Sequence, residues 1–111
     1  MEQITFEYWK KLKLRVGRIV TVARIPNTEK LYKIQVDIGL DRTIQIVSSL
    51  VPYYSSEELE GSSIVVLVNL KSTRFHGELS EGMLLTAEKE DGSTCILLKP
   101  EREIEPGTPI T

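Results

Sequence analysis

The sequence predicts an all-β protein, a five-stranded barrel with short helices and a C-terminal strand and tail. Three strand-like segments follow one another closely, at 14–25, 31–38 and 43–47. A helix-like segment follows these three strands, and after it come two further strand-like segments, at 63–70 and 83–88. Three strands, a helix and two strands, with a glycine inside the first strand, is the order expected of an OB-fold, a partly open Greek-key barrel.

Local patterns support each of the first three strands. Segment 14–25 is rich in β-branched residues, and Gly17 near its middle predicts a bulge or a sharp bend. Segments 31–38 and 43–47 alternate apolar and polar residues, as half-buried strands do. The short connections favour an antiparallel meander. The apolar positions expected to point inward are Tyr32, Ile34, Val36, Ile38, Ile44 and Ile46.

Two short helices are expected, at 5–12 and within 53–59. Thr5 can cap the first helix, and Ser55 with Glu58 three residues later is the pattern of a capping box at the second. The second helix separates the third strand from the fourth. An SH3-like barrel, the main competing fold, would not normally have a helix at that place.

The chain length favours one domain, because 111 residues can bury a single hydrophobic core without disulfides. We expect this domain to span 1–111, with its core at about 13–88 and a C-terminal extension at about 89–111. In the extension, Asp91-Gly92 predicts a hairpin that returns into a strand at 94–98. Two side chains are expected to dock the tail, Ile104 and Ile110.

Composition excludes several classes of protein. The chain is 41% hydrophobic and 27% charged, as globular proteins are. One cysteine, Cys95, and one histidine, His76, exclude an intrachain disulfide and a Cys/His zinc site within one chain. No apolar run approaches the roughly 20 residues of a membrane span, and no secretory signal is recognisable. We therefore expect a cytoplasmic protein with no membrane association, cofactor or metal.

Charge is distributed unevenly along the chain. The net charge of −2 argues at first against a nucleic-acid partner. However, residues 1–56 hold nine basic and five acidic residues, whereas 57–111 hold five basic and eleven acidic ones. The basic excess concentrates in 10–42, and a second window, 61–77, has no acidic residue at all. The distribution predicts a locally basic face that the net charge conceals.

The basic windows coincide with the positions of the OB-fold ligand loops. An OB-fold binds oligonucleotides or oligosaccharides on its strand 2–3 face and through the loops that join strands 1–2 and 4–5. In this sequence those loops are 26–30 and 71–82, the second being expected as a long polar loop. Their cationic or titratable side chains suit contacts to phosphates. These side chains are Lys30, Lys71, Arg74 and His76.

Other residue types near the second loop suit RNA. Asn69 and Ser80 can hydrogen-bond base edges or a 2′-hydroxyl group. Phe75 could stack on an unpaired base, but we expect it instead to plug one end of the barrel. Met83 is either a pliable apolar contact or part of the core.

Catalytic interpretations have little support. His76 could act as a general base, and Ser80 or Cys95 as a nucleophile. Cys95, however, falls in a predicted strand far in sequence from His76, as a packed or surface thiol would. The acidic stretch 88–91 lacks the spacing of a calcium loop, and no glycine-rich phosphate loop is present. We expect a binding protein and not an enzyme.

The chain resembles a known family, the tRNA-binding OB domain. This domain occurs as a free-standing structure-specific tRNA-binding protein and as the C-terminal domain or beta subunit of methionyl-tRNA synthetases. The resemblance covers essentially the whole chain, and the order of its blocks makes it specific. These blocks are Leu14-Arg15-Val16-Gly17-Arg18-Ile19, Pro26-Asn27 with Lys30-Leu31-Tyr32, Val36-Asp37-Ile38-Gly39, Ile46-Val47-Ser48-Ser49-Leu50, Glu57-Glu58-Leu59-Glu60-Gly61, Val68-Asn69-Leu70-Lys71 and Ser80-Glu81-Gly82-Met83-Leu84-Leu85.

The resemblance implies a homodimer that grips the outer corner of the L-shaped tRNA and assists an aminoacyl-tRNA synthetase. One departure stands at His76, where the family often has arginine, so a permanent positive charge is absent. The positions that the resemblance associates with RNA contact are Lys30, Asn69, Lys71, Arg74, Ser80 and Met83. We add Ser48, which lies beside them in the third-strand motif, and His76 to the candidate RNA-binding residues.

Two other functions stay open at this point. The chain could be a C-terminal dimerisation domain or a beta subunit of methionyl-tRNA synthetase. It could also be a chaperone-like OB dimer that binds unfolded polypeptide, because such dimers share the resemblance. The motif from Ser80 to Met83 favours tRNA over polypeptide.

Overall fold

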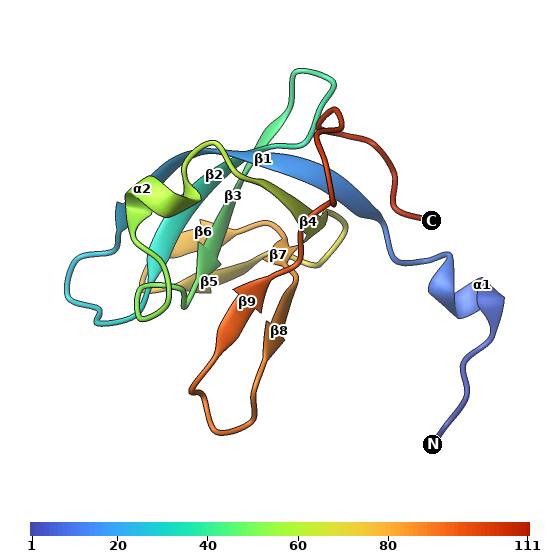
Figure 1. Ribbon diagram of the computed structural model, residues 1–111, viewed down its shortest axis with the longest axis horizontal. Helices are drawn as coiled ribbons and strands as arrows, with labels where there is room; N and C mark the ends of the chain where they lie inside the picture. The colour runs from blue at the N-terminus through green and yellow to red at the C-terminus, as the bar shows by residue number, and fades with distance from the viewer.

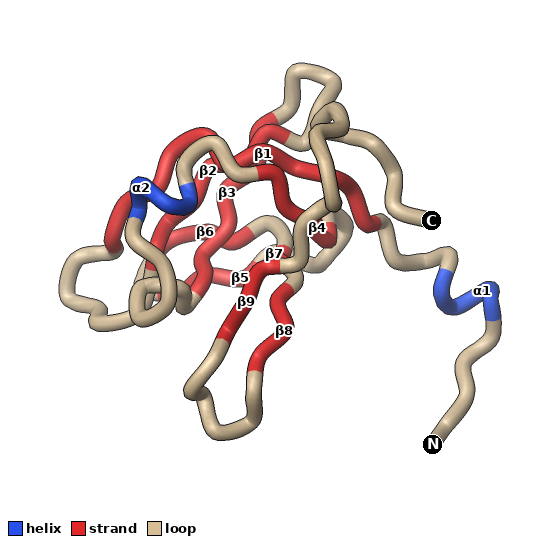
Figure 2. Tube along the Cα trace, viewed as in Figure 1, coloured by secondary structure: helices blue, strands red, loops and turns tan.

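A long first strand organises the computed structural model, which describes residues 1–111 (Figures 1 and 2). The main sheet has five antiparallel strands in the order β3-β2-β1-β4-β7. β1 pairs with β2 along its second half and with β4 along its first half. The strands of this sheet are β1 (Leu14–Arg24), β2 (Tyr32–Asp37), β3 (Thr43–Ser48), β4 (Ser63–Leu67) and β7 (Met83–Leu84).

The sheet curls into a nearly closed barrel, which brings its two edge strands, β3 and β7, toward each other. The strand β6 (Glu78–Ser80) lies along the free edge of β3. There the Val47 N–H donates to Ser80 Oγ at 3.0 Å, and the Glu81 N–H donates to the Gln45 carbonyl at 2.8 Å. This architecture confirms the predicted OB-fold.

The bend in β1 has a different origin from the one predicted. Gly17 is not the bulged residue, because the register with β2 shifts three positions later, between Ile19 and Thr21. A Cβ on Gly17 would instead lie 2.7 Å from Val36 Cγ1 and 3.2 Å from Ile64 Cδ1. The missing side chain therefore leaves room for core side chains of β2 and β4 to pack directly over the backbone of β1.

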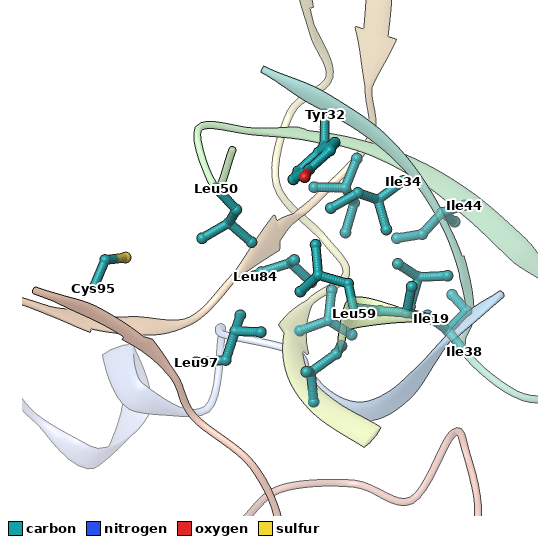
Figure 3. Close-up of a cluster of buried hydrophobic side chains, with 14 residues drawn as sticks. Ile19, Tyr32, Ile34, Ile38, Ile44, Leu50, Leu59, Leu84, Cys95 and Leu97 are labelled. Atoms are coloured by element: carbon teal, nitrogen blue, oxygen red, sulfur yellow. The ribbon is translucent and has the colours of Figure 1, made fainter. Parts of the chain in front are cut away.

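Fourteen buried side chains form the core of the barrel (Figure 3). The predicted alternation in β2 and β3 is confirmed, since Ile34 and Val36 on β2 and Ile44 and Ile46 on β3 are at most 1% exposed. Leu50 and Leu59, from the connection between β3 and β4, are equally buried and extend the core. Cys95, expected to be a packed or surface thiol, is buried.

Both helices have four residues: α1 (Phe6–Trp9), which is shorter than the predicted 5–12, and α2 (Ser56–Leu59), which lies within the predicted 53–59. Thr5 caps α1, and the predicted capping box of Ser55 and Glu58 is present at α2. The hydrogen bonds from Ser55 hold the pKa of Glu58 below its ordinary value. Neither helix has the length and the apolar content needed to cross a membrane.

The strand predicted at 83–88 is two strands in different sheets. β7 pairs with β4, whereas β8 (Thr86–Glu88) pairs with β9 (Cys95–Leu97) in a hairpin that projects from the barrel (Figure 1). The chain changes partner at Leu85, whose N–H donates to the Val65 carbonyl at 3.1 Å. Similarly, β4 ends at Leu67 and not at 70. Sequence periodicity could not place either break, because apolar residues continue across both.

The C-terminal tail docks on β1 mainly through backbone hydrogen bonds. The N–H groups of Gly107 and Ile110 donate to the carbonyls of Val16 and Leu14 at 2.7 and 2.9 Å. Ile104, predicted to help dock the tail, is 44% exposed and does not do so. The reason is that the tail follows the first half of β1 as an additional, irregular partner rather than covering an apolar surface.

We predict that Gly17→Ala lowers the free energy of unfolding by about 1–3 kcal/mol, because the added methyl group overpacks the core. Chemical denaturation followed by far-ultraviolet circular dichroism, which reports the strands of the barrel, measures this change. The cost should be smaller when Val36 is also replaced by alanine, since that removes the nearest clashing carbon. An equal cost in both backgrounds would contradict the close-packing role.

Candidate nucleic-acid interface

The segment predicted as a long polar loop contains a β-hairpin. β5 (Thr73–Phe75) pairs with β6, and the two-residue turn His76–Gly77 joins them. Both turn residues have positive φ, 50° and 82°, as tight hairpin turns require. The sequence hides this hairpin because its strands have three residues each and little alternation. Contacts between β6 and β3 stabilise it instead.

The cations of this segment are exposed. Lys71 precedes the hairpin, and Arg74 lies on β5, where one guanidinium N–H donates to the Gly77 carbonyl at 3.1 Å. The remaining donors of Arg74 form no hydrogen bond within the protein, which leaves them free for a phosphate. Phe75, expected to plug the barrel, is 45% exposed. That expectation was wrong because residues of the connection between β3 and β4 fill the core instead.

The tip of the hairpin and the loop between β1 and β2 meet in a shallow notch. His76 from the hairpin and Lys30 from the loop both line it, together with Ser49. The loop is shaped by Asn27, whose φ is 64°, and by Thr28, whose hydroxyl donates to the Ile25 carbonyl at 2.7 Å. The fold thus brings together Lys30 and His76, which are 46 positions apart in the sequence.

The Ser80 side chain supports the barrel and does not point to a ligand surface. It is 5% exposed, accepts the Val47 N–H and donates to the Gly82 carbonyl at 3.3 Å, so its hydroxyl is occupied within the barrel closure. Gly82 beside it is equally constrained, since a Cβ there would lie 2.6 Å from the Leu67 carbonyl oxygen. Ser48, at the end of β3 opposite Tyr32, is half-buried.

Asn69 and Met83 lie at the ends of β4 and β7. The Asn69 amide accepts the Lys13 N–H at 2.9 Å and donates to the Lys11 carbonyl at 2.7 Å, which ties the segment before β1 to the end of β4. Met83 pairs with Leu67 on the sheet edge and is 45% exposed. Both Asn69 groups therefore have partners within the chain, whereas the Met83 side chain is open to a ligand.

Only some cations of the predicted basic face lack an acidic partner. Arg18 pairs with Glu103 of the tail at 2.7 Å, and Lys33 pairs with Glu78 of the hairpin at 3.4 Å. Sequence analysis missed these pairs because their partners are distant in the chain. No ion pair involves the site's predicted cationic residues, which are Lys30, Lys71, Arg74 and His76. No cluster of three metal-ligating side chains is present.

The barrel and its exposed cationic loops define an OB-fold nucleic-acid-binding module. The sequence model of one family, described as "Putative tRNA binding domain", matches residues 14–109. The chain therefore belongs to the tRNA-binding domain family, as its sequence blocks indicated.

Methionine–tRNA ligases are among the relatives of this chain. The methionine–tRNA ligase of Archaeoglobus fulgidus is 47% identical over 109 residues, which are 98% of this chain but 16% of that ligase. The corresponding ligase of Methanocaldococcus jannaschii is 43% identical over 110 residues, 99% of this chain and 17% of the ligase. The chain thus spans about a sixth of the length of these curated relatives.

Solved structures support the same relationship. A MetRS-related protein from Pyrococcus horikoshii superposes with a TM-score of 0.92 and 34% identity, and each chain is covered in full. The chaperone CsaA from Bacillus anthracis superposes with a TM-score of 0.89 and 29% identity, covering 99% of this chain and 100% of the other.

We predict that Ser80→Ala lowers the free energy of unfolding by about 1 kcal/mol, because the Val47 N–H loses its acceptor at the barrel closure. Ser72→Ala is the matched control, since Ser72 is exposed and forms no hydrogen bond. Thermal unfolding of the two variants compares them directly. Equal stability of Ser80→Ala and the unsubstituted chain would contradict a structural role for this hydroxyl.

Proposed function

We propose that the chain is a structure-specific tRNA-binding protein of the cytoplasm, which grips the outer corner of the L-shaped tRNA. Membership of the tRNA-binding domain family is the observation that carries this proposal. The exposed cations of the hairpin and of the loop between β1 and β2 support it, because they have no acidic partner and can neutralise phosphates.

The proposed site has a cationic part and an accessory part. Lys30, Lys71 and Arg74 neutralise phosphates, and His76 lies beside Lys30 in the notch, where its ring nitrogens can form a hydrogen bond with RNA. Met83 offers an exposed apolar contact. Asn69 and Ser80, which the resemblance also associates with RNA, act chiefly by holding the surface in place, because their side chains are hydrogen-bonded within the chain. Ser48, half-buried beside them, has no internal side-chain hydrogen bond and is an accessory contact.

The protein acts as an auxiliary to an aminoacyl-tRNA synthetase. Its similarity to methionine–tRNA ligases supports that partner class, and it equally fits a C-terminal domain or beta subunit of such an enzyme. Binding, and not catalysis, is its role. Cys95 is buried in the β8–β9 hairpin, whereas His76 lies at the exposed tip of another hairpin, so they do not form a nucleophile and base pair.

A homodimer is the assembly that the fold supports. α1 buries none of its residues and stands away from the barrel (Figure 1). A groove of about 360 Å³ separates it from β1 and the tail. A second copy could cover this apolar surface and place two cationic sites side by side, which would double the number of phosphates bound. The apolar residues of the groove are Phe6, Trp9, Leu12, Leu14, Pro109 and Ile110.

A second candidate function is the binding of unfolded polypeptide. The likeness to the chaperone CsaA favours it, and exposed apolar side chains such as Phe6 and Phe75 could contact a peptide. Competition distinguishes the two functions. If tRNA is the ligand, folded tRNA should bind far more tightly than an unfolded peptide, and a large molar excess of peptide should be needed to displace it.

We predict that Lys71→Ala with Arg74→Ala abolishes tRNA binding, or weakens it roughly tenfold or more, and lowers the salt slope of the affinity by about two for each protomer that contacts the tRNA. The matched control is Lys89→Ala with Lys99→Ala, which removes two exposed cations of the C-terminal extension. A salt-titrated gel shift with folded tRNA measures both. Unchanged binding by the first variant, or affinity independent of salt, would place the site elsewhere.

We predict that the chain has the mass of a dimer and that Phe6→Glu halves this mass, because a charge would be buried in the interface. Leu40→Glu is the control, since Leu40 is a fully exposed residue at the β2–β3 turn. Light scattering after size exclusion gives the masses. A monomeric unsubstituted chain, or a Phe6→Glu dimer as stable as that of Leu40→Glu, would count against this interface.

A further inference from the structure

A carboxylate lies on the face where OB-folds usually bind oligonucleotides, the outward face of strands 2 and 3. Glu78 reaches this face from β6, and its Oε2 lies 3.4 Å from Lys33 Nζ on β2. Its Oε1 accepts from Gln45 Nε2 on β3, also at 3.4 Å. Gln45 Oε1 in turn accepts from Gln35 Nε2 at 2.9 Å. The polar groups at the centre of the face are therefore bonded to one another.

The position of this carboxylate is fixed by the barrel closure. The Gln45 side chain also donates to the Leu79 carbonyl at 2.8 Å, and Ser80 accepts the Val47 N–H. Glu78 and Lys33 are each about one-third exposed, at 33% and 35%, so water screens their attraction only partly. The ion pair is thus part of a connected structure and not an incidental surface contact.

The same face lacks the groups that a single strand needs. Its outward positions on β2 are Lys33, Gln35 and Asp37, and those on β3 are Thr43, Gln45 and Val47. Lys33 is the only cation among them, and none is aromatic. Proteins that bind extended single strands combine a cationic groove with aromatic side chains on which bases stack.

We propose that Glu78 is a specificity-determining residue, which neutralises Lys33 and closes the strand 2–3 face to extended single-stranded RNA. RNA then binds only at the exposed cations of the loops, where a folded molecule presents phosphates at fixed positions. The proposal rests on the proposed tRNA-binding function and adds how folded RNA is selected. Selection comes from repulsion of the wrong ligand as well as attraction of the right one.

Glu78→Gln tests this inference, because the amide removes the charge while its oxygen can still accept from Gln45. The affinity for a poly(U) oligomer should rise about threefold or more, and its salt slope should steepen by about one, as one phosphate contact is gained. The affinity for folded tRNA should stay within about twofold. Fluorescence anisotropy at several salt concentrations measures both ligands, and thermal unfolding checks the hairpin.

Three further variants make the test specific. Glu88→Gln changes the net charge equally at an exposed residue of β8 without a partner, and should alter neither affinity. Lys33→Gln alone should leave poly(U) binding unchanged, because Lys33 is already neutralised. In Glu78→Gln with Lys33→Gln the gain should disappear. Because the double variant carries the same change at Glu78, a gain caused only by a loosened hairpin would persist in it, whereas a gain that depends on Lys33 would not.

Four results would overturn the inference: no gain for poly(U), an equal gain for tRNA, a gain that persists without Lys33, or weaker poly(U) binding by Lys33→Gln. Failure of the unsubstituted chain to bind tRNA would instead reject the proposed function. The poly(U) gain of Glu78→Gln remains measurable in that case, so the two failures can be distinguished.

Discussion

The close packing at Gly17 is the constraint on which the other parts of the structure depend. β1 pairs with both β2 and β4, and core side chains of those two strands fill the space where a Cβ on Gly17 would stand, with Val36 Cγ1 only 2.7 Å from that position. A side chain at position 17 would displace these core side chains, which stand on the strands that curl to bring β6 against β3. The barrel closure, the hairpin on it and the positions of the exposed cations all follow from that curvature.

The closure between β3 and β6 connects the core to the proposed binding surface. It depends on a few polar contacts, among them those of Ser80 and Gln45, rather than on a long strand ladder. These side chains hold a short hairpin that has too few residues to be stable alone. Arg74 and His76 are thereby held by the barrel itself, although the sequence around them looks like a flexible loop. A rigidly held cation loses less entropy when it binds a phosphate.

The distribution of charge over the folded surface, and not the net charge, decides where this protein can bind a polyanion. The net charge of −2 and the basic window at 10–42 both fail to describe the surface, because pairing across the fold decides which cations are free. Arg18 and Lys33 meet acidic residues 85 and 45 positions away. Lys30 and Lys71 meet none. A protein with this pattern can bind RNA at selected places while most of its surface repels a polyanion.

The sequence by itself determined the OB-fold, the buried faces of β2 and β3, the capping box at α2 and the family, because these depend on local periodicity or on ordered sequence blocks. Tertiary structure alone decided where strands 63–70 and 83–88 break, that Phe75 is exposed, and that Ser80 and Asn69 are bonded internally. The physical reason is that the local sequence shows whether a residue is apolar or polar, but it does not show which distant residue that side chain contacts. Its partner, often more than 30 positions away, is chosen by the curvature of the barrel.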